Sequence, residues 1–151
     1  RRKHYHFEAR AIRQHTVLGV AGSSLDIAAE FATGSDDTCG ISLMHSSDKR
    51  SRVDIVFDAA NQCLAVRTAQ NNQVTQSREM LHTLAAGEPL KLRVLLDGSV
   101  VEIIANSRTS ITSRIYPAQA GDFLVQLLGR TSYIQSLDIW EMDSIWRCST
   151  R

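Results

Sequence analysis

The residues of this chain best placed to do chemistry are the carboxylates of Asp97 and Glu102, which stand close together in one β-rich stretch. Two carboxylates that face each other can divide the work of a general acid and a base or nucleophile. Each residue also has a simpler role: Asp97 precedes Gly98 as a turn residue, and Glu102 is expected to face Arg93 in an exposed ion pair. The sequence therefore favours structural roles for both carboxylates and predicts no catalytic residue in this chain.

The histidines and cysteines do not form a recognisable metal or cofactor site. Of the five histidines, only His4 and His6 share a strand face, and without further converging ligands we predict them to be surface imidazoles. Three cysteines occur without Cys-x-x-Cys spacing, although one pair could bridge in an oxidising compartment. Glycine-rich phosphate loops and the Gly-x-Ser-x-Gly and His-Glu-x-x-His motifs do not occur. The sequence predicts no metal and no cofactor.

Several aromatic side chains could stack on a ligand ring if they were exposed beside converging polar groups. Around Trp140 the sequence alternates so that Leu137 and Ile139 form one strand face, and Trp140 and Met142 form the other. Both faces are apolar there, so packing in the core or against another domain fits the pattern at least as well as ligand binding. The candidates are Tyr5, Tyr116, Tyr133, Trp140 and Trp146.

Residues 90–106 contain the clearest structural signal, two alternating β-branched runs joined by Asp97-Gly98. Asp-Gly favours a two-residue hairpin turn because both residues tolerate positive φ. This turn predicts a core face and a mixed outer face, with Glu102 paired to Arg93. The core face has Leu92, Val94 and Leu96 opposite Ile103, Val101 and Ser99, and the outer face has Lys91, Arg93, Val100, Glu102 and Ile104.

Other segments share the period of two that marks strands with one buried face. We expect strands over residues 5–12, 25–31, 40–45, 53–58, 63–67, 79–83, 109–116, 123–128 and 136–142, and an exposed Gln/Asn-rich loop over 68–77. About ten or eleven strands with no helical apolar stripe predict an all-β fold, a jelly-roll-like antiparallel sandwich of two sheets. Residues 1–151 are expected to form this single domain.

Composition excludes several classes of function. The chain has 17 basic and 16 acidic side chains, and their scatter leaves no basic patch for nucleic acid. Its apolar runs are far shorter than the roughly 20 residues that cross a bilayer, so no membrane partner is predicted. The chain begins Arg1-Arg2-Lys3 without methionine and soon enters strand-like sequence, so we expect it to be the C-terminal part of a longer chain.

Two motifs in residues 90–117 match a known pattern. Leu-x-Val-x-x-Asp-x-Ser-x-x-Glu is carried by Leu92, Val94, Asp97, Ser99 and Glu102, and Thr-x-Arg-x-Tyr-Pro by Thr112, Arg114, Tyr116 and Pro117. In these motifs the chain resembles the C-terminal β-sandwich of glycoside hydrolase family 32, the invertase, inulinase and levanase group. Residues 24–31 and 136–146 resemble the opening and closing strands of that domain, so the resemblance spans nearly the whole chain.

The chain departs from the family pattern at two places. The family commonly has Leu-x-Val-Asp-Arg where residues 64–68 read Leu-Ala-Val-Arg-Thr, so ligand contacts from that strand are not carried over. It also usually has a Phe-containing turn where this chain has residues 103–106.

The resemblance implies that the catalytic groups lie elsewhere. In the family they belong to a preceding five-bladed propeller, with an Asn-Asp-Pro-Asn nucleophile motif, an Arg-Asp-Pro motif and a Glu-Cys acid/base motif. Both prolines of this chain follow other residues, Glu88 and Tyr116, and Glu-Cys does not occur, so we expect the catalytic propeller to be absent from it. The implied partners are that propeller in the same protein, a fructan or sucrose, and a second copy in a homodimer; the family indicates an extracellular or vacuolar location.

Three hypotheses for function follow, in this order. The first is a non-catalytic sandwich that packs on the propeller of a β-fructofuranosidase, the second a lectin-like fructan-binding module, and the third an unrelated jelly-roll interaction domain. Glu102, Arg114 and Tyr116 are the candidate carbohydrate contacts. The family motif Asp97, Ser99, Glu102, Arg114, Tyr116 and Pro117 is otherwise expected to be structural.

Overall fold

The computed structural model describes residues 3–11, 16–34, 38–45, 50–115, 122–129 and 133–143. Within these ranges the chain forms twelve strands and no helix, and so has no helix that could cross a bilayer. The strands are β1 (Lys3–Ala11), β2 (Thr16–Gly22), β3 (Ser24–Ala32), β4 (Thr38–His45), β5 (Arg52–Asp58), β6 (Cys63–Gln70), β7 (Gln73–Leu81), β8 (Leu90–Asp97), β9 (Val100–Ala105), β10 (Thr109–Arg114), β11 (Phe123–Gly129) and β12 (Tyr133–Glu141).

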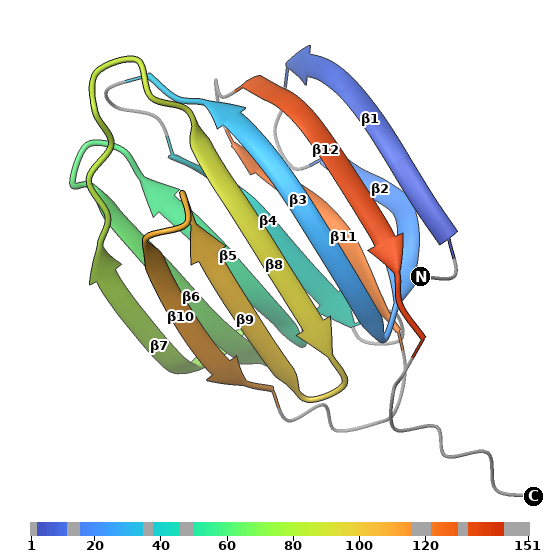
Figure 1. Ribbon diagram of the computed structural model, residues 1–151. Coiled ribbons are helices and arrows are strands. Elements are labelled where there is room, and N and C mark those ends of the chain that lie inside the picture. The colour runs from blue at the N-terminus through green and yellow to red at the C-terminus, as the bar shows by residue number, and fades with distance from the viewer. Residues whose placement is uncertain are drawn as a thin grey trace, which may run out of the picture.

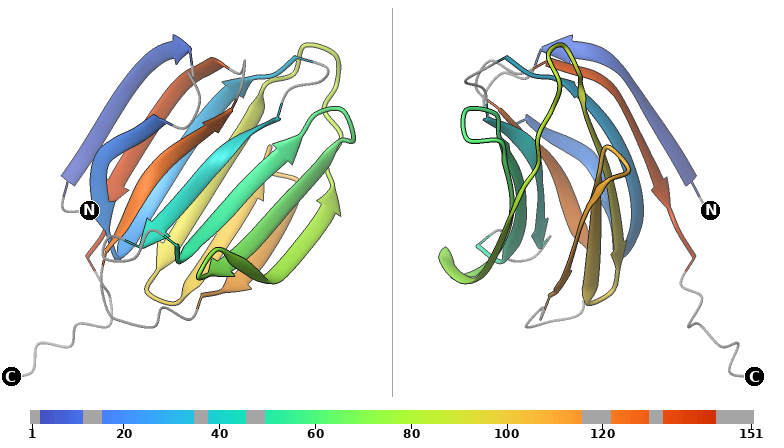
Figure 2. Two further views of the ribbon diagram at one scale, coloured as in Figure 1. Left: turned by 180° about the vertical axis from the view of Figure 1, so that it is seen from behind. Right: turned by 60° about the vertical axis from the view of Figure 1, so that its left-hand side comes forward.

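The strands form two six-stranded sheets that lie face to face (Figure 1). The first sheet has the order β1-β12-β3-β8-β9-β10 and the second the order β2-β11-β4-β5-β6-β7. Neighbouring strands are antiparallel throughout. The end strands β10 and β7 approach each other along one side of the molecule (Figure 2). The predicted all-β, antiparallel two-sheet sandwich is therefore confirmed.

The core lies between the two sheets and follows the alternation of each strand. In β8 and β10, for example, every second side chain is buried. Full burial of a large aliphatic or aromatic side chain contributes roughly 1.5–3 kcal/mol, so these inward faces supply the main stabilising term. The largest fully buried side chains are Phe31, Phe57, Leu25, Ile27, Ile41, Leu43, Ile55, Leu64, Leu90, Leu92, Leu96 and Ile103.

The β8–β9 hairpin has the predicted faces. Its inward residues Leu92, Val94, Val101 and Ile103 are each at most 2% exposed. The residues that alternate with these inward ones, among them Arg93 and Glu102, lie on the outer face of the first sheet. Alternation alone was enough to place these side chains, since its period of two matches the pleat.

The predicted register of this hairpin is wrong by two residues. Asp97 pairs with Val100, so the loop consists of Gly98 and Ser99 instead of Asp97 and Gly98. Gly98 has φ of 59°, and a glycine with positive φ at the first loop position is what a type II′ turn requires. Glu102 consequently faces Leu95, and the predicted pairing of Glu102 with Arg93 does not form. Ser99, predicted to face Leu96, is an exposed loop residue.

The Gln/Asn-rich segment is a strand and not a loop. β7 pairs along β6, and the two are joined by Asn71 and Asn72, whose φ values of 52° and 61° suit a tight type I′ turn. Most side chains of β7 are exposed, which explains the polar sequence of this sheet edge. Beyond Leu81 the chain leaves the strand, so the strand predicted for residues 79–83 is only the end of β7.

Strand β2 has no counterpart among the strands predicted from the sequence. Its residues Thr16–Gly22 include two glycines, which weaken the strand signal. Pairing with β11 supplies the hydrogen bonds that hold it, and Leu18 and Val20 are buried.

The cysteines of the described ranges do not bridge each other. Cys39 and Cys63 are not joined by a disulfide, and Cys148 lies outside the described residues.

Candidate functional site

Asp97 and Ser99 of the family motif lie at the tip of the β8–β9 hairpin. The backbone N–H of Gly98 donates to the carbonyl of Ser23 at 3.0 Å, and the hydroxyl of Ser24 donates to Oδ1 of Asp97 at 3.2 Å. The carbonyl of Ser99 accepts from the N–H of Ile115 at 2.6 Å. These contacts tie the hairpin tip to the turn before β3 and to the end of β10.

Glu102 and Arg114 lie on the outer face of the first sheet. Glu102 is flanked by Leu95 of β8 and Thr112 of β10, and Arg114 is opposite Val100. Within the part of the chain that the structure describes, neither forms an ion pair. The structure therefore brings these two candidate carbohydrate contacts to the same corner of one face, while Tyr116 and Pro117 lie outside the described residues.

Arg93 pairs with Asp26 of β3. Its Nε and Nη2 donate to the two carboxylate oxygens at 2.5 and 2.6 Å, a bidentate arrangement that fixes both groups. These hydrogen bonds raise the pKa of Arg93 above its usual value. The guanidinium carbon also lies 5.8 Å from the ring centre of Trp140. The sequence contained only part of the signal for this pair: an acid between the buried residues Leu25 and Ile27 must face outward.

Trp140 and the two N-terminal histidines form a cluster beside that ion pair. The ring of His4 stacks on Trp140 with centroids 4.8 Å apart and an interplanar angle of 7°. Nε2 of His4 and Nδ1 of His6 each lie 2.8 Å from the same oxygen of Asp138. Burial raises the pKa of Asp138, but the hydrogen bonds from His6 and His4 outweigh it and lower the pKa overall.

Trp140 is therefore half-buried, with His4 stacked on one face of its ring and the guanidinium of Arg93 close to it. Among the described residues, no group of three or more His, Cys, Asp or Glu side chains could hold a metal ion.

Asn106 joins the connection before β8 to the β9–β10 turn. Its Oδ1 accepts from the Lys91 N–H at 3.2 Å and lies 3.0 Å from Nε2 of the buried His82. Its Nδ2 donates to the carbonyl of Pro89 at 2.9 Å. With φ of 49° it occupies the left-handed region, which asparagine tolerates better than most residues.

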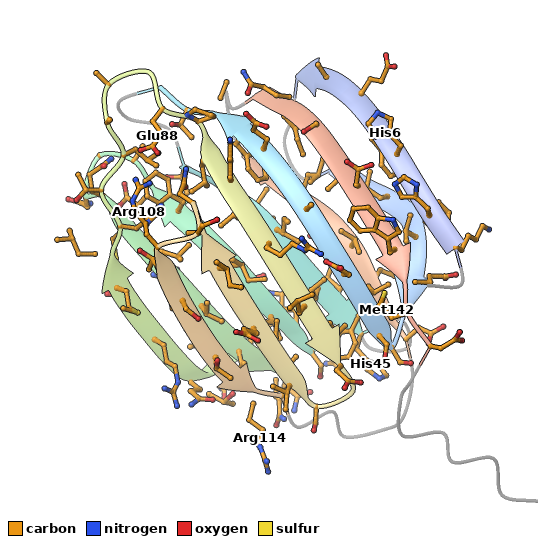
Figure 3. All side chains as sticks on the ribbon, in the orientation of Figure 1. His6, His45, Glu88, Arg108, Arg114 and Met142 are labelled. Carbon is orange, nitrogen blue, oxygen red and sulfur yellow. The ribbon has the colours of Figure 1, made fainter. Side chains whose placement is uncertain are left out.

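Glu88 and Arg108 form an ion pair at the end of the molecule where Asn106 lies (Figure 3). Nη1 and Nη2 of Arg108 donate to the two oxygens of Glu88 at 2.9 and 2.7 Å. The hydrogen bonds from Arg108, with a further one from the N–H of Ala85, lower the pKa of Glu88 from 4.5 to about 2. This pair holds the β7–β8 connection to the turn that follows β9.

A cavity of about 540 Å³ opens at the opposite end of the sandwich, where β10 approaches the ends of β4, β5, β6, β7 and β11. Most of its described lining residues are polar, and among the described motif residues Arg114 contributes to it. The ring of Phe123 meets that of His45 edge-on in the wall, with centroids 5.6 Å apart. The lining residues are His45, Ser51, Arg52, Thr68, Ala69, Gln70, Thr75, Gln76, Arg114, Ile115 and Phe123.

Comparison with known proteins identifies the family. The sequence profile described as "Glycosyl hydrolases family 32 C terminal" matches residues 1–141. "Acid beta-fructofuranosidase 2, vacuolar" from a Rosa hybrid cultivar is 45% identical over 64 residues, which are 38% of this chain and 10% of that protein. "6(G)-fructosyltransferase" from Asparagus officinalis is 41% identical over 69 residues, covering 41% of this chain and 11% of that protein. The chain thus spans about a tenth of these relatives.

Solved structures share the fold at low sequence identity. Fructan 1-exohydrolase IIa from Cichorium intybus superposes with a TM-score of 0.75 at 17% identity, over 95% of this chain and 36% of that one. A galectin from Caenorhabditis elegans superposes with a TM-score of 0.72 at 9% identity, over 90% of this chain and 96% of that one. These likenesses show the fold alone. Because the profile covers residues 1–141 of 151, the chain belongs to glycoside hydrolase family 32, as its C-terminal β-sandwich domain.

Proposed function

We propose that this domain serves a family 32 β-fructofuranosidase as a non-catalytic module that packs against the catalytic propeller of the same protein. The observation that carries the proposal is the match of residues 1–141 to the C-terminal part of that family. The superposition with the Cichorium intybus enzyme also supports the proposal. It covers only 36% of that enzyme, so most of such an enzyme lies outside the region that this chain matches.

The contacts of the acidic residues support a non-catalytic role. Asp26 is ion-paired with Arg93, Glu88 with Arg108, and Asp97 accepts from Ser24. A glycosidase needs two carboxylates that flank one open site at a separation of about 5–10 Å. No acidic side chain is among the described residues that line the cavity of about 540 Å³.

Exposed apolar side chains support the packing. Val74, Met80 and Leu81 of the edge strand β7 are 57%, 44% and 74% exposed, and Val100 is 37% exposed. Interfaces between domains of one chain typically bury about 600–1,500 Å², of mixed polarity. Val74, Met80 and Leu81 stand among the polar residues of β7, and we expect them to contribute to such an interface of mixed polarity.

This surface differs from the one that the sequence indicated. Trp140 is partly covered by His4, and Met142 is half-buried. Trp146, another of the aromatic candidates from the sequence, lies outside the described residues.

Two experiments test the proposal. The purified chain should release no fructose from sucrose, inulin or levan, and measurable release would refute the non-catalytic role. If the gene encodes a propeller upstream, that propeller made separately should bind this chain, and binding should protect β7 amides from hydrogen exchange. A stable and active propeller that does not bind the added chain would contradict the packing role.

Fructan binding is a second candidate function, favoured by one observation. Glu102 and Arg114 share the outer face at one corner of the first sheet, with the exposed hydroxyl-bearing Thr112 beside Glu102. A carboxylate, a guanidinium and a hydroxyl are groups that can hydrogen-bond to sugar hydroxyls. We rank it second because the described residues at this corner include no aromatic side chain on which a sugar ring could stack.

A further inference from the structure

We propose that the outer face of β2, β11 and β4, which form one half of the second sheet, is the surface on which the catalytic propeller packs. The inference rests on the proposed function and adds the face through which the domain is held. In the left view of Figure 2 the three strands lie side by side, in blue, orange and cyan, with no other strand in front of them. The residues that these strands turn outward carry the inference.

Strand β11 has the sequence of a strand that is covered on both faces. Phe123, Val125 and Leu127 point into the core and are at most 3% exposed. Leu124 and Leu128, which alternate with them, point outward and are half-buried. Strands with one face in water usually alternate apolar and polar residues, whereas near-continuous apolar runs mark strands that are buried on both faces. The outward leucines therefore indicate that another body covers β11.

The strands on either side of β11 also turn uncharged residues outward. Leu124 pairs with Ala21 of β2 and with Met44 of β4. Gln126 pairs with Ser42 of β4. Among the described side chains, the outward positions of the three strands hold glycine, alanine, serine, threonine, glutamine, methionine and leucine, and none is acidic, basic or histidine. Charged residues are depleted at the centre of protein interfaces, so this composition suits a surface that is removed from water.

The outer face of the first sheet has the opposite character. Each of its six strands turns at least one acidic or basic side chain outward. Removal of charged groups from water costs several kcal/mol per ion unless each group is well paired. This face is therefore the less favourable one for a permanent contact. Examples from the six strands are Glu8, Asp138, Glu30, Arg93, Glu102 and Arg114.

Charged residues return on the other half of the second sheet, where they pair with one another. Nε of Arg52 lies 3.0 Å from Oδ2 of Asp54 on β5. Nη2 of Arg67 on β6 lies 3.2 Å from Oε1 of Glu79 on β7. Protein interfaces commonly have an apolar centre and a polar rim, and these two pairs suit the rim. The exposed apolar side chains of β7 lie beyond them, at the edge of the same sheet.

The size of the uncharged face suits a contact between domains. β2, β11 and β4 have 7, 7 and 8 residues. At about 3.4 Å per residue and about 4.8 Å between strands, the three strands cover a projected area of roughly 350 Å². An interface between domains buries about 600–1,500 Å² in total, which is about 300–750 Å² on each side. The three strands alone are therefore large enough for one side of such an interface.

The propeller is the occupant that these observations favour. The region that superposes with this chain is only 36% of the Cichorium intybus enzyme, so most of that polypeptide is available to cover the domain. A partner in the same polypeptide covers the face in every molecule, and permanent interfaces are more hydrophobic than transient ones. A second copy of the chain is the alternative occupant, and its binding would depend on protein concentration.

Hydroxyl-radical footprinting tests the proposal by comparing the purified chain with the same domain in the complete enzyme. Oxidation of Leu124 and Leu128 should be about threefold or more slower in the complete enzyme, because the centre of an interface excludes water. Leu95 and Ile104 are the matched control, since they are half-buried on the outer face of the first sheet. Their oxidation should be equal in the two proteins.

Two lysine variants give an independent test. Leu124→Lys places a charge on the proposed face, so it should lower the melting temperature of the domain in the complete enzyme by about 3 °C or more beyond its effect in the purified chain. Leu95→Lys makes the same change on the opposite face and should have equal effects in the two proteins. Circular dichroism verifies that both variants of the purified chain are folded.

The results separate this inference from the proposed function. Slower oxidation of Leu95 and Ile104, with Leu124 and Leu128 unchanged, would place the propeller on the first sheet and overturn the inference while the packing stands. If none of the four is protected, the packing itself fails, and the inference with it. Protection of Leu124 that is already present in the purified chain and is lost on dilution would assign the face to a second copy and overturn the inference. Equal effects of Leu124→Lys in the two proteins would also overturn it.

Discussion

Arg93 on β8 donates two hydrogen bonds, at 2.5 and 2.6 Å, to the carboxylate of Asp26 on β3, and thereby joins two adjacent strands across the outer face of the first sheet. The Asp26 side chain is 5% exposed, whereas that of Arg93 is 44% exposed. Removal of the arginine would leave a largely buried carboxylate without its cation. We predict that Arg93→Ala lowers the free energy of unfolding by about 2–3 kcal/mol, measured by urea denaturation.

The control for this prediction is the exposed pair formed by Arg67 and Glu79, at 3.2 Å with side chains 40% and 56% exposed. Arg67→Ala should cost less than about 1 kcal/mol, because water screens such pairs. If Arg93→Ala and Arg67→Ala lower the free energy of unfolding equally, the burial of Asp26 does not make its pairing with Arg93 more important for stability.

Substitution of three glycines by alanine distinguishes the cost of backbone strain from the cost of a steric collision. Gly98 has φ of 59° and open space where a Cβ would be added, so Gly98→Ala should cost about 1 kcal/mol through the backbone alone. A Cβ on Gly40 would collide with the backbone carbonyl oxygen of Ile55, so Gly40→Ala should cost about 3 kcal/mol or more. Gly19 has neither feature and is the control, with an expected change within about 0.5 kcal/mol.

Thermal unfolding followed by circular dichroism gives all three values under one condition. A Gly98→Ala variant as stable as the Gly19→Ala variant would contradict the two-residue turn of Gly98 and Ser99.

The Glu88–Arg108 pair predicts a pH dependence of stability. The pKa of Glu88 is lowered from 4.5 to about 2, so the folded state binds the proton less readily than the unfolded state. The stabilisation is therefore fully present above about 4.5 and is lost as the pH falls toward 2. We predict that the melting temperature of Glu88→Gln falls less than that of the parent chain between these pH values.

Other carboxylates also contribute to the acid dependence of stability, since the pKa values of Asp58 and Asp138 are lowered too. The difference between Glu88→Gln and the parent chain isolates the contribution of Glu88. Arg108→Gln should produce the same flattening, because it removes the donor that lowers the pKa of Glu88. If the melting temperatures of the parent chain and the variants fall equally with pH, the predicted contribution of the Glu88–Arg108 pair is wrong.

Isothermal titration with fructose, inulin and levan distinguishes the two candidate functions. If packing on a propeller is the sole role, none of the three should bind at millimolar concentration. Millimolar or tighter binding that is lost in Glu102→Ala, Arg114→Ala or Tyr116→Ala would instead establish the fructan-binding function. Thr38→Ala, a change at an exposed position of β4 away from this corner, should leave any such binding unaltered.

For the β8–β9 hairpin, the sequence determined which side chains are buried but not how the strands align. Alternation places Leu92, Val94, Val101 and Ile103 inward whatever the register, because a shift of two residues leaves every side chain on the same face. Asp97-Gly98 and Gly98-Ser99 are both acceptable turns by local chemistry. Hydrogen bonds from Gly98 to Ser23 and from Ser24 to Asp97 accompany the observed alignment, and they join segments far apart in the chain.

β7 shows where local sequence patterns are insufficient. Its polar, Gln/Asn-rich sequence resembles a loop because an edge strand with mostly exposed side chains needs no apolar stripe. β6 supplies the hydrogen-bonding partners that make it a strand, and Asn71 and Asn72 supply the turn. The two consecutive asparagines were the local signal that could have revealed the hairpin.

The sequence alone determined the sandwich class, the inward faces of its strongest strands and the family, because these depend on residue periodicity and on motifs contained in single segments. The tertiary structure alone decided the partners of the charged residues. Arg93 takes Asp26 and not Glu102, and residues of both sheets line one cavity. Ion pairs and cavities depend on distances between strands that are remote in the chain, and those distances are set only when the two sheets pack.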